Sequence, residues 1–149
     1  MREALRRART SVAEGGGPFA ALVVRDGAVL AVGTNRVVAD RDPTAHAEVV
    51  AIREACRVLG THRLDGCEIY ASCEPCPMCA AAIAWSRAAR LRYAATRDDA
   101  AAVGFDDAAL HAEAGRPPEA RSLPAERLLA GEALGPFEAW ASKSDRVPY

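Results

Sequence analysis

Apolar positions along the chain follow two spacings, one typical of β-strands and the other typical of α-helices. Two apolar runs, at residues 19–25 and 28–33, flank Asp26 and Gly27. An Asp-Gly pair between apolar runs suits the two-residue turn that joins antiparallel strands, so this pattern predicts a β-hairpin. Shorter strand-like runs follow at residues 67–72 and 91–96, and a weaker one lies at 127–129.

Helical spacing of apolar residues predicts three principal helices. The first covers residues 1–14 and ends at a run of glycines. The second is predicted to begin at Thr44, which can cap it, and to end at Leu59 before Gly60. Its expected buried stripe consists of Val49, Ile52, Cys56 and Leu59. The third covers residues 77–86, and weaker helical patterns lie at residues 98–103, 107–114 and 136–142.

The order of these elements predicts the fold class. Strands and helices alternate from the second hairpin strand onward, and such alternation implies right-handed crossovers between strands of one sheet. We therefore expect an α/β protein: a three-layer α/β/α sandwich around a mixed five-stranded sheet. A chain of 149 residues has the length of one ordinary domain, so residues 1–149 are expected to form a single domain.

Composition narrows the class of protein further. Half of the residues are hydrophobic and 26% are charged, which is typical of a soluble globular chain. The 19 basic and 20 acidic residues give a net charge of −1, so a nucleic-acid-binding surface is not indicated. Neither a run of about 18 apolar residues nor a secretory signal is evident, and we expect a cytoplasmic protein without membrane association. Five cysteines in such a compartment favour thiols or metal ligands over disulfides.

The most informative segment is residues 75–79, which read PCPMC, taken together with His46 one strand-helix unit earlier. Cys76 and Cys79 lie three residues apart at a helix start, where the helix dipole favours the thiolate form that binds zinc. His46 lies at the start of another predicted helix, and helix starts can meet at the carboxyl ends of neighbouring strands. Three ligands leave a fourth tetrahedral position for water, which is typical of a catalytic zinc site.

Glu48 completes this set, because it follows the histidine by two residues. A carboxylate there can reach the water of the open position, take its proton and return it to a substrate nitrogen. The pattern H-x-E with P-C-x-x-C is the signature of zinc nucleobase deaminases.

Plainer interpretations stand beside this one. A C-x-x-C pair in an α/β protein can also be a redox pair, so a zinc or thiol redox-sensing module is the non-enzymatic alternative. The other cysteines fit a helix stripe or a strand and are interpreted as structural: Cys56, Cys67 and Cys73. His62 and His111 lie in polar segments and are interpreted as surface residues.

These motifs resemble the cytidine deaminase superfamily and, within it, the bacterial guanine deaminases. The resemblance covers almost the whole chain, in residues 16–19, 42–48, 72–79, 104–107, 136–140 and the terminal Tyr149. The first three segments recur in several purine deaminases, including those that act on tRNA adenosine. The last three discriminate better, although the 104–107 motif and the terminal tyrosine also occur in plant guanosine deaminases.

The resemblance implies a role for each of ten residues and one zinc ion per chain. It implies zinc on His46, Cys76 and Cys79, with Glu48 as the proton shuttle. It implies that the purine is bound by Asn35, Phe19, Ala47, Trp85, Asp107 and Tyr149, with Phe19 and Trp85 against the ring and Asp107 at the guanine edge. From the residues alone, Phe19 and Trp85 can equally be core residues, and Asp107 can be a helix cap. Glu113 is a further acidic candidate.

The function that the resemblance implies is hydrolytic deamination of guanine to xanthine and ammonia. Deamination of guanosine, cytosine or tRNA adenosine is the enzymatic alternative. The near-zero net charge and the tail at residues 146–149, which is not strongly basic, weaken the tRNA interpretation. We expect a small-molecule purine substrate and a homodimer in which subunits can exchange C-terminal segments.

Overall fold

The computed structural model describes residues 1–148, which divide into two compact units. The first unit is Met1–His111, and the second begins at Ala112. Tyr149, predicted to bind substrate, lies outside the described residues.

The first unit is built on a mixed sheet whose strands lie in the order β2-β1-β3-β4. Strand β1 is antiparallel to both β2 and β3, whereas β3 and β4 are parallel. The strands are β1 (Ala20–Arg25), β2 (Ala28–Thr34), β3 (Glu68–Cys73) and β4 (Arg90–Ala95). Each lies within about one residue of its predicted range.

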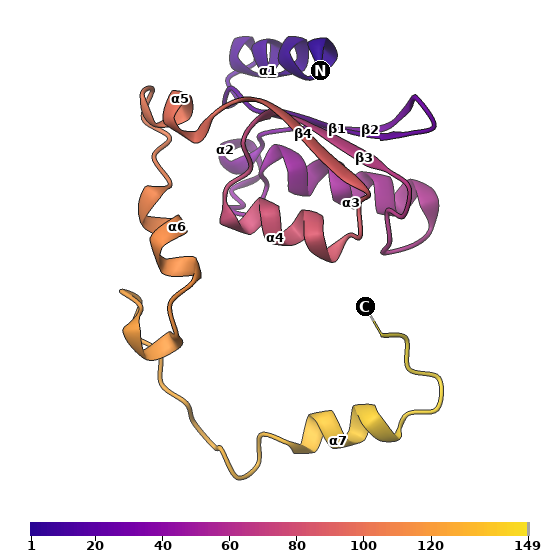
Figure 1. Cartoon of the computed structure of the whole chain (residues 1–149), viewed down its shortest axis with the longest axis vertical. Helices are drawn as coiled ribbons and strands as arrows, with labels where there is room; N and C mark the ends of the chain where they lie inside the picture. Colours follow the sequence, from indigo (N-terminus) through magenta and orange to yellow (C-terminus); the bar gives the residue numbers. More distant parts are fainter. Residues whose placement is uncertain (149) are drawn as a thin grey trace. The chain divides into compact units, whose positions relative to one another are not determined.

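Helices cover both faces of this sheet, as predicted (Figure 1). Helix α1 (Arg2–Ala13) packs against one face, where it contacts β1, β2 and β3. Helix α3 (Ala47–Leu59) packs against the other face and contacts α4 (Pro77–Trp85). The first unit is therefore a three-layer α/β/α sandwich.

The prediction of a five-stranded sheet is wrong for the described residues, because their sheet has four strands. Residues 127–129 form no strand, and Leu128 and Leu129 are 68% and 71% exposed. The φ of Leu129 is 51°, in the left-handed region that strands do not use. An apolar pair without a partner strand gains too little burial to become a strand.

The predicted hairpin is confirmed between β1 and β2. Asp26 and Gly27 have φ values of 49° and 77°, and two successive positive φ values are what the tight turn between twisted strands requires. The register shifts between Val23 and Val24, which places a bulge in β1.

The start of α3 differs from the prediction in a way that shapes the site. The helix begins at Ala47 with His46 as its N-cap residue, rather than at Thr44. The backbone N–H and the hydroxyl of Thr44 both donate to Asp42 Oδ1, at 2.8 and 2.7 Å. Thr44 therefore stabilises the preceding turn and does not cap the helix.

The buried face of α3 is also offset from the predicted stripe. Its fully buried apolar residues are Ala47, Ala51 and Ala55, while Ile52, Cys56 and Leu59 are only partly buried beside the core. Small residues face the sheet because the helix lies close to β2. A Cβ added at Gly33 would lie 2.1 Å from the carbonyl oxygen of Ala47, so only glycine allows this approach.

The remaining helices are short and mostly close to their predicted ranges. Helix α2 was not predicted from the sequence. These elements are α2 (Val37–Asp40), α5 (Arg97–Ala101), α6 (Ala108–Ala114), the 3-10 helix η1 (Pro118–Ala120) and α7 (Gly135–Ser142).

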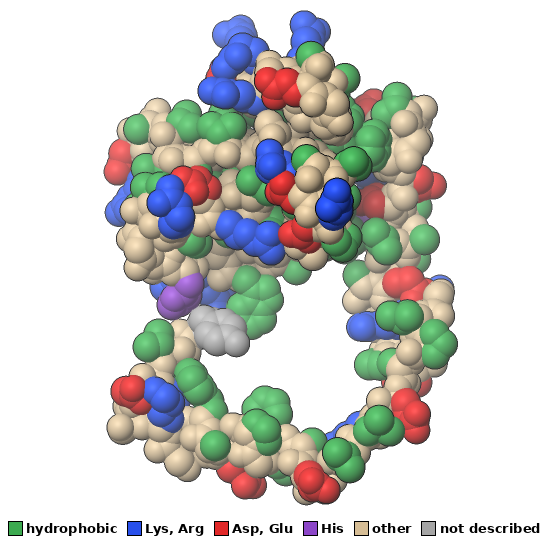
Figure 2. All heavy atoms as spheres, turned by 180° about the vertical axis from the view of Figure 1, so that it is seen from behind, with side chains coloured by type: hydrophobic (Ala, Val, Ile, Leu, Met, Phe, Trp, Pro, Cys, Tyr) green, Lys and Arg blue, Asp and Glu red, His purple; other side chains and the backbone are tan. Residues whose placement is uncertain are grey.

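From residue 112 onward the described chain buries none of its residues. Several large apolar side chains there are more than 60% exposed, among them Leu123, Leu134 and Phe137. On the first unit, Figure 2 shows basic and acidic side chains interspersed on the visible face. Among the described helices, none is long and apolar enough to cross a membrane.

Candidate active site

Three predicted metal ligands come together at two helix starts. His46 is the N-cap residue of α3, Cys76 is the N-cap residue of α4, and Cys79 lies in the first turn of α4. The Nδ1 atom of His46 lies 3.6 Å from Cys76 Sγ and 3.5 Å from Cys79 Sγ. All three ligand atoms lie within 4.8 Å of one another.

These distances test whether the residues fit zinc. In a tetrahedral site with ordinary Zn–N and Zn–S bonds, a nitrogen and a sulfur ligand are about 3.6 Å apart. The distances from His46 to the two sulfurs match that separation. The donor set of one imidazole and two thiolates suits zinc, and three protein ligands leave a coordination position open. His46, Cys76 and Cys79 therefore fit a catalytic zinc ion.

Local electrostatics favour a thiolate at this cluster. The hydrogen bond from the Cys79 thiol, with a further one from His46, lowers the pKa of Cys76 to about 4. The same hydrogen bond raises the pKa of Cys79, because its proton is held between the two sulfurs. The hydrogen bond to Cys76 raises the pKa of His46. A negatively charged sulfur at a helix N-terminus is ready to bind a cation.

Glu48 lies in the first turn of α3 and is only 7% exposed. Burial raises the pKa of its carboxyl, because the charged form loses its hydration. It lines the same cavity as His46 and Cys76. A carboxyl with a raised pKa beside a metal site suits the transfer of protons at neutral pH.

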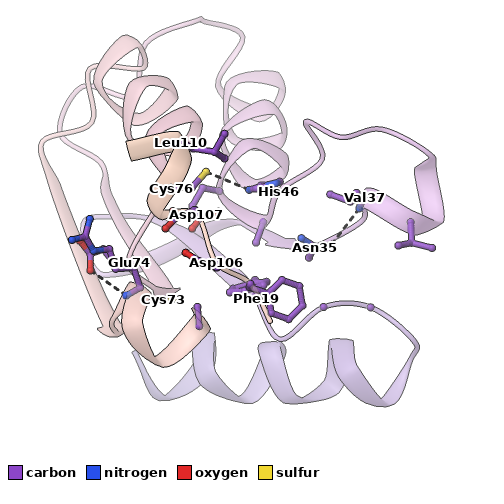
Figure 3. Close-up of a pocket in the computed structure, with 18 of the residues that line it drawn as sticks. Phe19, Asn35, Val37, His46, Cys73, Glu74, Cys76, Asp106, Asp107 and Leu110 are labelled. Carbon is purple, nitrogen blue, oxygen red and sulfur yellow. Dashed lines mark hydrogen bonds between the residues drawn. The ribbon is translucent and has the colours of Figure 1, made fainter. Parts of the chain in front are cut away.

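A cavity of about 510 Å³ opens beside these residues (Figure 3). Its walls come from the residues just before β1 and just after β2, from α2 and the end of β3, from the starts of α3 and α4, and from the segment from α5 into α6. Because the ligand-bearing helix starts and this last segment meet around one space, a small molecule there would contact both the metal ligands and the 104–107 motif.

Two aromatic rings form one wall of the cavity. Phe19 and Phe105 pack edge to face, with ring centroids 4.9 Å apart and planes at 87°. Phe19 immediately precedes β1, and Figure 3 shows its ring at the cavity. The sequence analysis predicts no role for Phe105. Its place in the 104–107 motif was the only sequence feature that could have indicated one.

Asn35 and Ala47, for which the resemblance implies a role in binding the purine, also line the cavity. The side-chain oxygen of Asn35 accepts a hydrogen bond from the backbone N–H of Val37, at 3.3 Å. With its oxygen held in this way, the amide NH₂ group of Asn35 remains for another partner. Ala47 is fully buried at the first position of α3.

Asp107 lines the cavity, and its side chain does not cap α6. The backbone N–H of Ala108 donates to Asp106 Oδ1 instead, at 2.9 Å. Asp107 Oδ2 lies 3.2 Å from Nε2 of His111. His111 was interpreted as a surface residue, yet its side chain is only 29% exposed.

Other predicted residues do not join this cavity. Trp85 ends α4, is 59% exposed and is not among the cavity-lining residues. In the second unit, the carboxylate of Glu113 accepts hydrogen bonds from Arg116 and Ser122.

The family model of the cytidine and deoxycytidylate deaminase zinc-binding region matches residues 1–95. The chain belongs to this deaminase family. The matched range contains all three metal ligands and Glu48, so the zinc site belongs to the part that defines the family.

Among relatives of this deaminase, a guanine deaminase of Bacillus subtilis (strain 168) is 49% identical over 97% of the chain and 96% of that protein. A crystal structure of guanine deaminase from Bacillus subtilis is 48% identical, with a TM-score of 0.96, covering 99% of this chain and 95% of that one. A tRNA-specific adenosine deaminase of Aquifex aeolicus (strain VF5) is 42% identical over 95 residues, which are 64% of this chain and 63% of that protein.

Proposed function

We propose that the protein hydrolyses guanine to xanthine and ammonia. The chemistry is supported by a zinc-fitting cluster and a buried carboxyl in one cavity. The substrate assignment rests on how much of the chain resembles each kind of deaminase. Similarity to a guanine deaminase runs through 97% of the chain, whereas similarity to a tRNA adenosine deaminase stops at 64%. The same full-length likeness supports one deaminase domain over residues 1–149.

His46, Cys76 and Cys79 would hold the metal ion. Zinc at such a site acts as a Lewis acid and lowers the pKa of a water molecule in its open position. Glu48 accepts a proton from the attacking water and delivers it to the ring nitrogen next to the amino-bearing carbon. The carboxylate then takes the remaining proton from the added hydroxyl group and delivers it to the amine, so that a C=O bond forms as the C–N bond breaks. The overall exchange is water for ammonia.

The cavity walls supply groups that suit a planar purine. The ring of Phe19, supported by Phe105, offers an apolar surface for the base. The free NH₂ group of Asn35 can donate to a ring nitrogen or carbonyl oxygen. The carboxylate of Asp107 can accept from an N–H of the guanine edge. Ala47 lines the cavity next to His46.

The proposed enzyme is a homodimer that exchanges C-terminal segments. This proposal is supported by the second unit, which buries no described residue and exposes Leu123, Leu134 and Phe137. Large apolar side chains left exposed in this number are typical of an interaction surface. In such a dimer Trp85 and Tyr149 are proposed to complete the substrate site. Light scattering of the full chain tests the stoichiometry, and a monomer at micromolar concentration would contradict it.

A substrate panel tests the proposed function. Zinc-loaded enzyme is incubated with guanine, guanosine, cytosine and an adenosine-bearing tRNA anticodon stem, and ammonia release is measured. We expect release from guanine above all others. Turnover of guanosine but not guanine would assign the nucleoside instead. No turnover of any substrate, with a metal-free disulfide between Cys76 and Cys79, would favour the redox-sensing alternative.

A further inference from the structure

Helix α6 carries two ionisable side chains one turn apart, Asp107 just before its first residue and His111 within it. Asp107 Oδ2 and His111 Nε2 lie 3.2 Å apart. Residues four apart on a helix face the same side, so this contact follows from their spacing. In the proposed function Asp107 binds the guanine edge, whereas His111 has no role.

Both side chains are largely removed from solvent. The side chain of Asp107 is 20% exposed and that of His111 is 29% exposed. The Nε2 atom of His111 is shielded from solvent and has no aligned hydrogen-bond partner among the described residues. Leaving a buried imidazole nitrogen unpaired costs free energy, and Asp107 Oδ2 lies close enough to pair with it after a small rotation. Hydrogen bonds of this kind are often poorly aligned in the ligand-free enzyme and tighten in the complex.

The backbone does not hold the carboxylate of Asp107 in place. The first free N–H of α6, that of Ala108, is used by Asp106. Figure 3 shows Asp106 and Asp107 on the wall of the cavity. A carboxylate with two oxygens and one partner can keep one oxygen on that partner and offer the other to a ligand.

We infer that His111 is a positioning residue that holds one oxygen of Asp107, so that the other oxygen receives an N–H of the purine edge. His111 acts through Asp107 and does not touch the substrate. The inference rests on the proposed function, because it assigns a purine to the cavity that Asp107 lines.

The test compares two substitutions of His111 in the zinc-loaded full-length enzyme. His111→Leu removes the donor, whereas His111→Gln keeps one, because glutamine can hydrogen-bond an aspartate four residues away on a helix. We expect His111→Leu to raise KM for guanine roughly tenfold with kcat almost unchanged, as expected for one lost charge-assisted hydrogen bond. His111→Gln should recover most of that loss. His62→Leu, outside the cavity, is the matched control.

A double-mutant cycle separates positioning from a structural role. In the Asp107→Asn background, His111→Leu should change KM by less than about twofold, because the two residues act as one unit. An equal loss in both backgrounds, or a Gln variant as impaired as the Leu variant, would overturn the inference.

A spectroscopic readout does not depend on turnover or on the Leu variant folding. The ¹⁵N NMR signal of His111 Nε2 should move when Asp107 is replaced by Asn, and an unmoved signal would also overturn the inference. Failure of the wild-type enzyme to release ammonia from guanine would instead overturn the proposed function.

Discussion

Gly33 in β2 and Ala47 in α3 are in backbone contact: a Cβ at position 33 would lie 2.1 Å from the Ala47 carbonyl oxygen and 2.6 Å from the Ala51 nitrogen. This contact brings the first turn of α3 against the sheet, and that turn carries Glu48 next to the ligand His46. The position of the metal ligands therefore depends on a glycine outside the metal motif.

The first prediction concerns this contact. Gly33→Ala should lower the free energy of unfolding by about 1–3 kcal/mol, since overpacking against rigid backbone forces α3 to shift. It should also weaken zinc binding. Urea denaturation and zinc titration measure the two effects. Gly131→Ala is the matched control, because nothing lies within 4 Å of a Cβ there. Equal stability of the two variants would contradict the prediction.

The second prediction concerns the proton-transfer group. Glu48→Gln keeps the shape of the side chain but cannot accept a proton, so kcat for guanine should fall at least 10²-fold. Zinc content should stay at one ion per chain, because Glu48 is not a ligand. Steady-state kinetics and metal analysis of the same preparation check both statements. Retained turnover in this variant would remove Glu48 from the mechanism.

The third prediction concerns metal and stability together. Cys76→Ala should lose zinc and lower the melting temperature, since ligands of a bound metal contribute to folding. Removing zinc from the wild type with a chelator should lower the melting temperature similarly. The free energy of unfolding should fall by about 4 kcal/mol relative to protein in free zinc at a thousand times its Kd. Cys56→Ala, at a free thiol away from the cluster, should retain zinc. Calorimetry with and without chelator separates these cases.

The fourth prediction concerns pH and α1. Hydrogen bonds from Arg6 and Arg7 hold the pKa of Glu3 near 2, below its ordinary 4.5. The folded state thus favours the ionised carboxylate, so its stabilising effect is complete above about pH 4.5 and is lost as the pH falls toward 2.

An NMR titration of the Glu3 carboxyl should show this depressed midpoint. Arg6→Ala should move the midpoint upward, and added salt should do the same because the group is exposed. A midpoint at the ordinary value in low salt would contradict the prediction.

The chemistry of the site was predictable because its signals are local. Cys76 and Cys79 lie within one helical turn, and His46 and Glu48 lie within two residues of each other at another helix start. Three-residue spacing places Cys76 and Cys79 on one side of α4. His46 lies at the N-cap of α3, where its ring can project past the end of the helix that carries Glu48. The hairpin was predictable for the same reason, since its turn needs only Asp26 and Gly27.

Other features depend on segments far apart in the sequence. Thr44 has the side chain of a helix cap, but in the folded chain its hydroxyl donates to Asp42 instead. The buried face of α3 consists of small residues because the helix packs against Gly33. Phe105 meets Phe19, and His111 approaches Asp107 at the cavity wall, only in the folded chain.

The sequence by itself determined the donor atoms, the hairpin and the family resemblance, because each follows from the spacing of neighbouring residues along the backbone. Only the tertiary structure decided which side chains share the cavity and that a fifth strand is missing from the described residues. These outcomes depend on which distant surfaces pack against one another, and the burial that such packing produces is not encoded in any short stretch of residues.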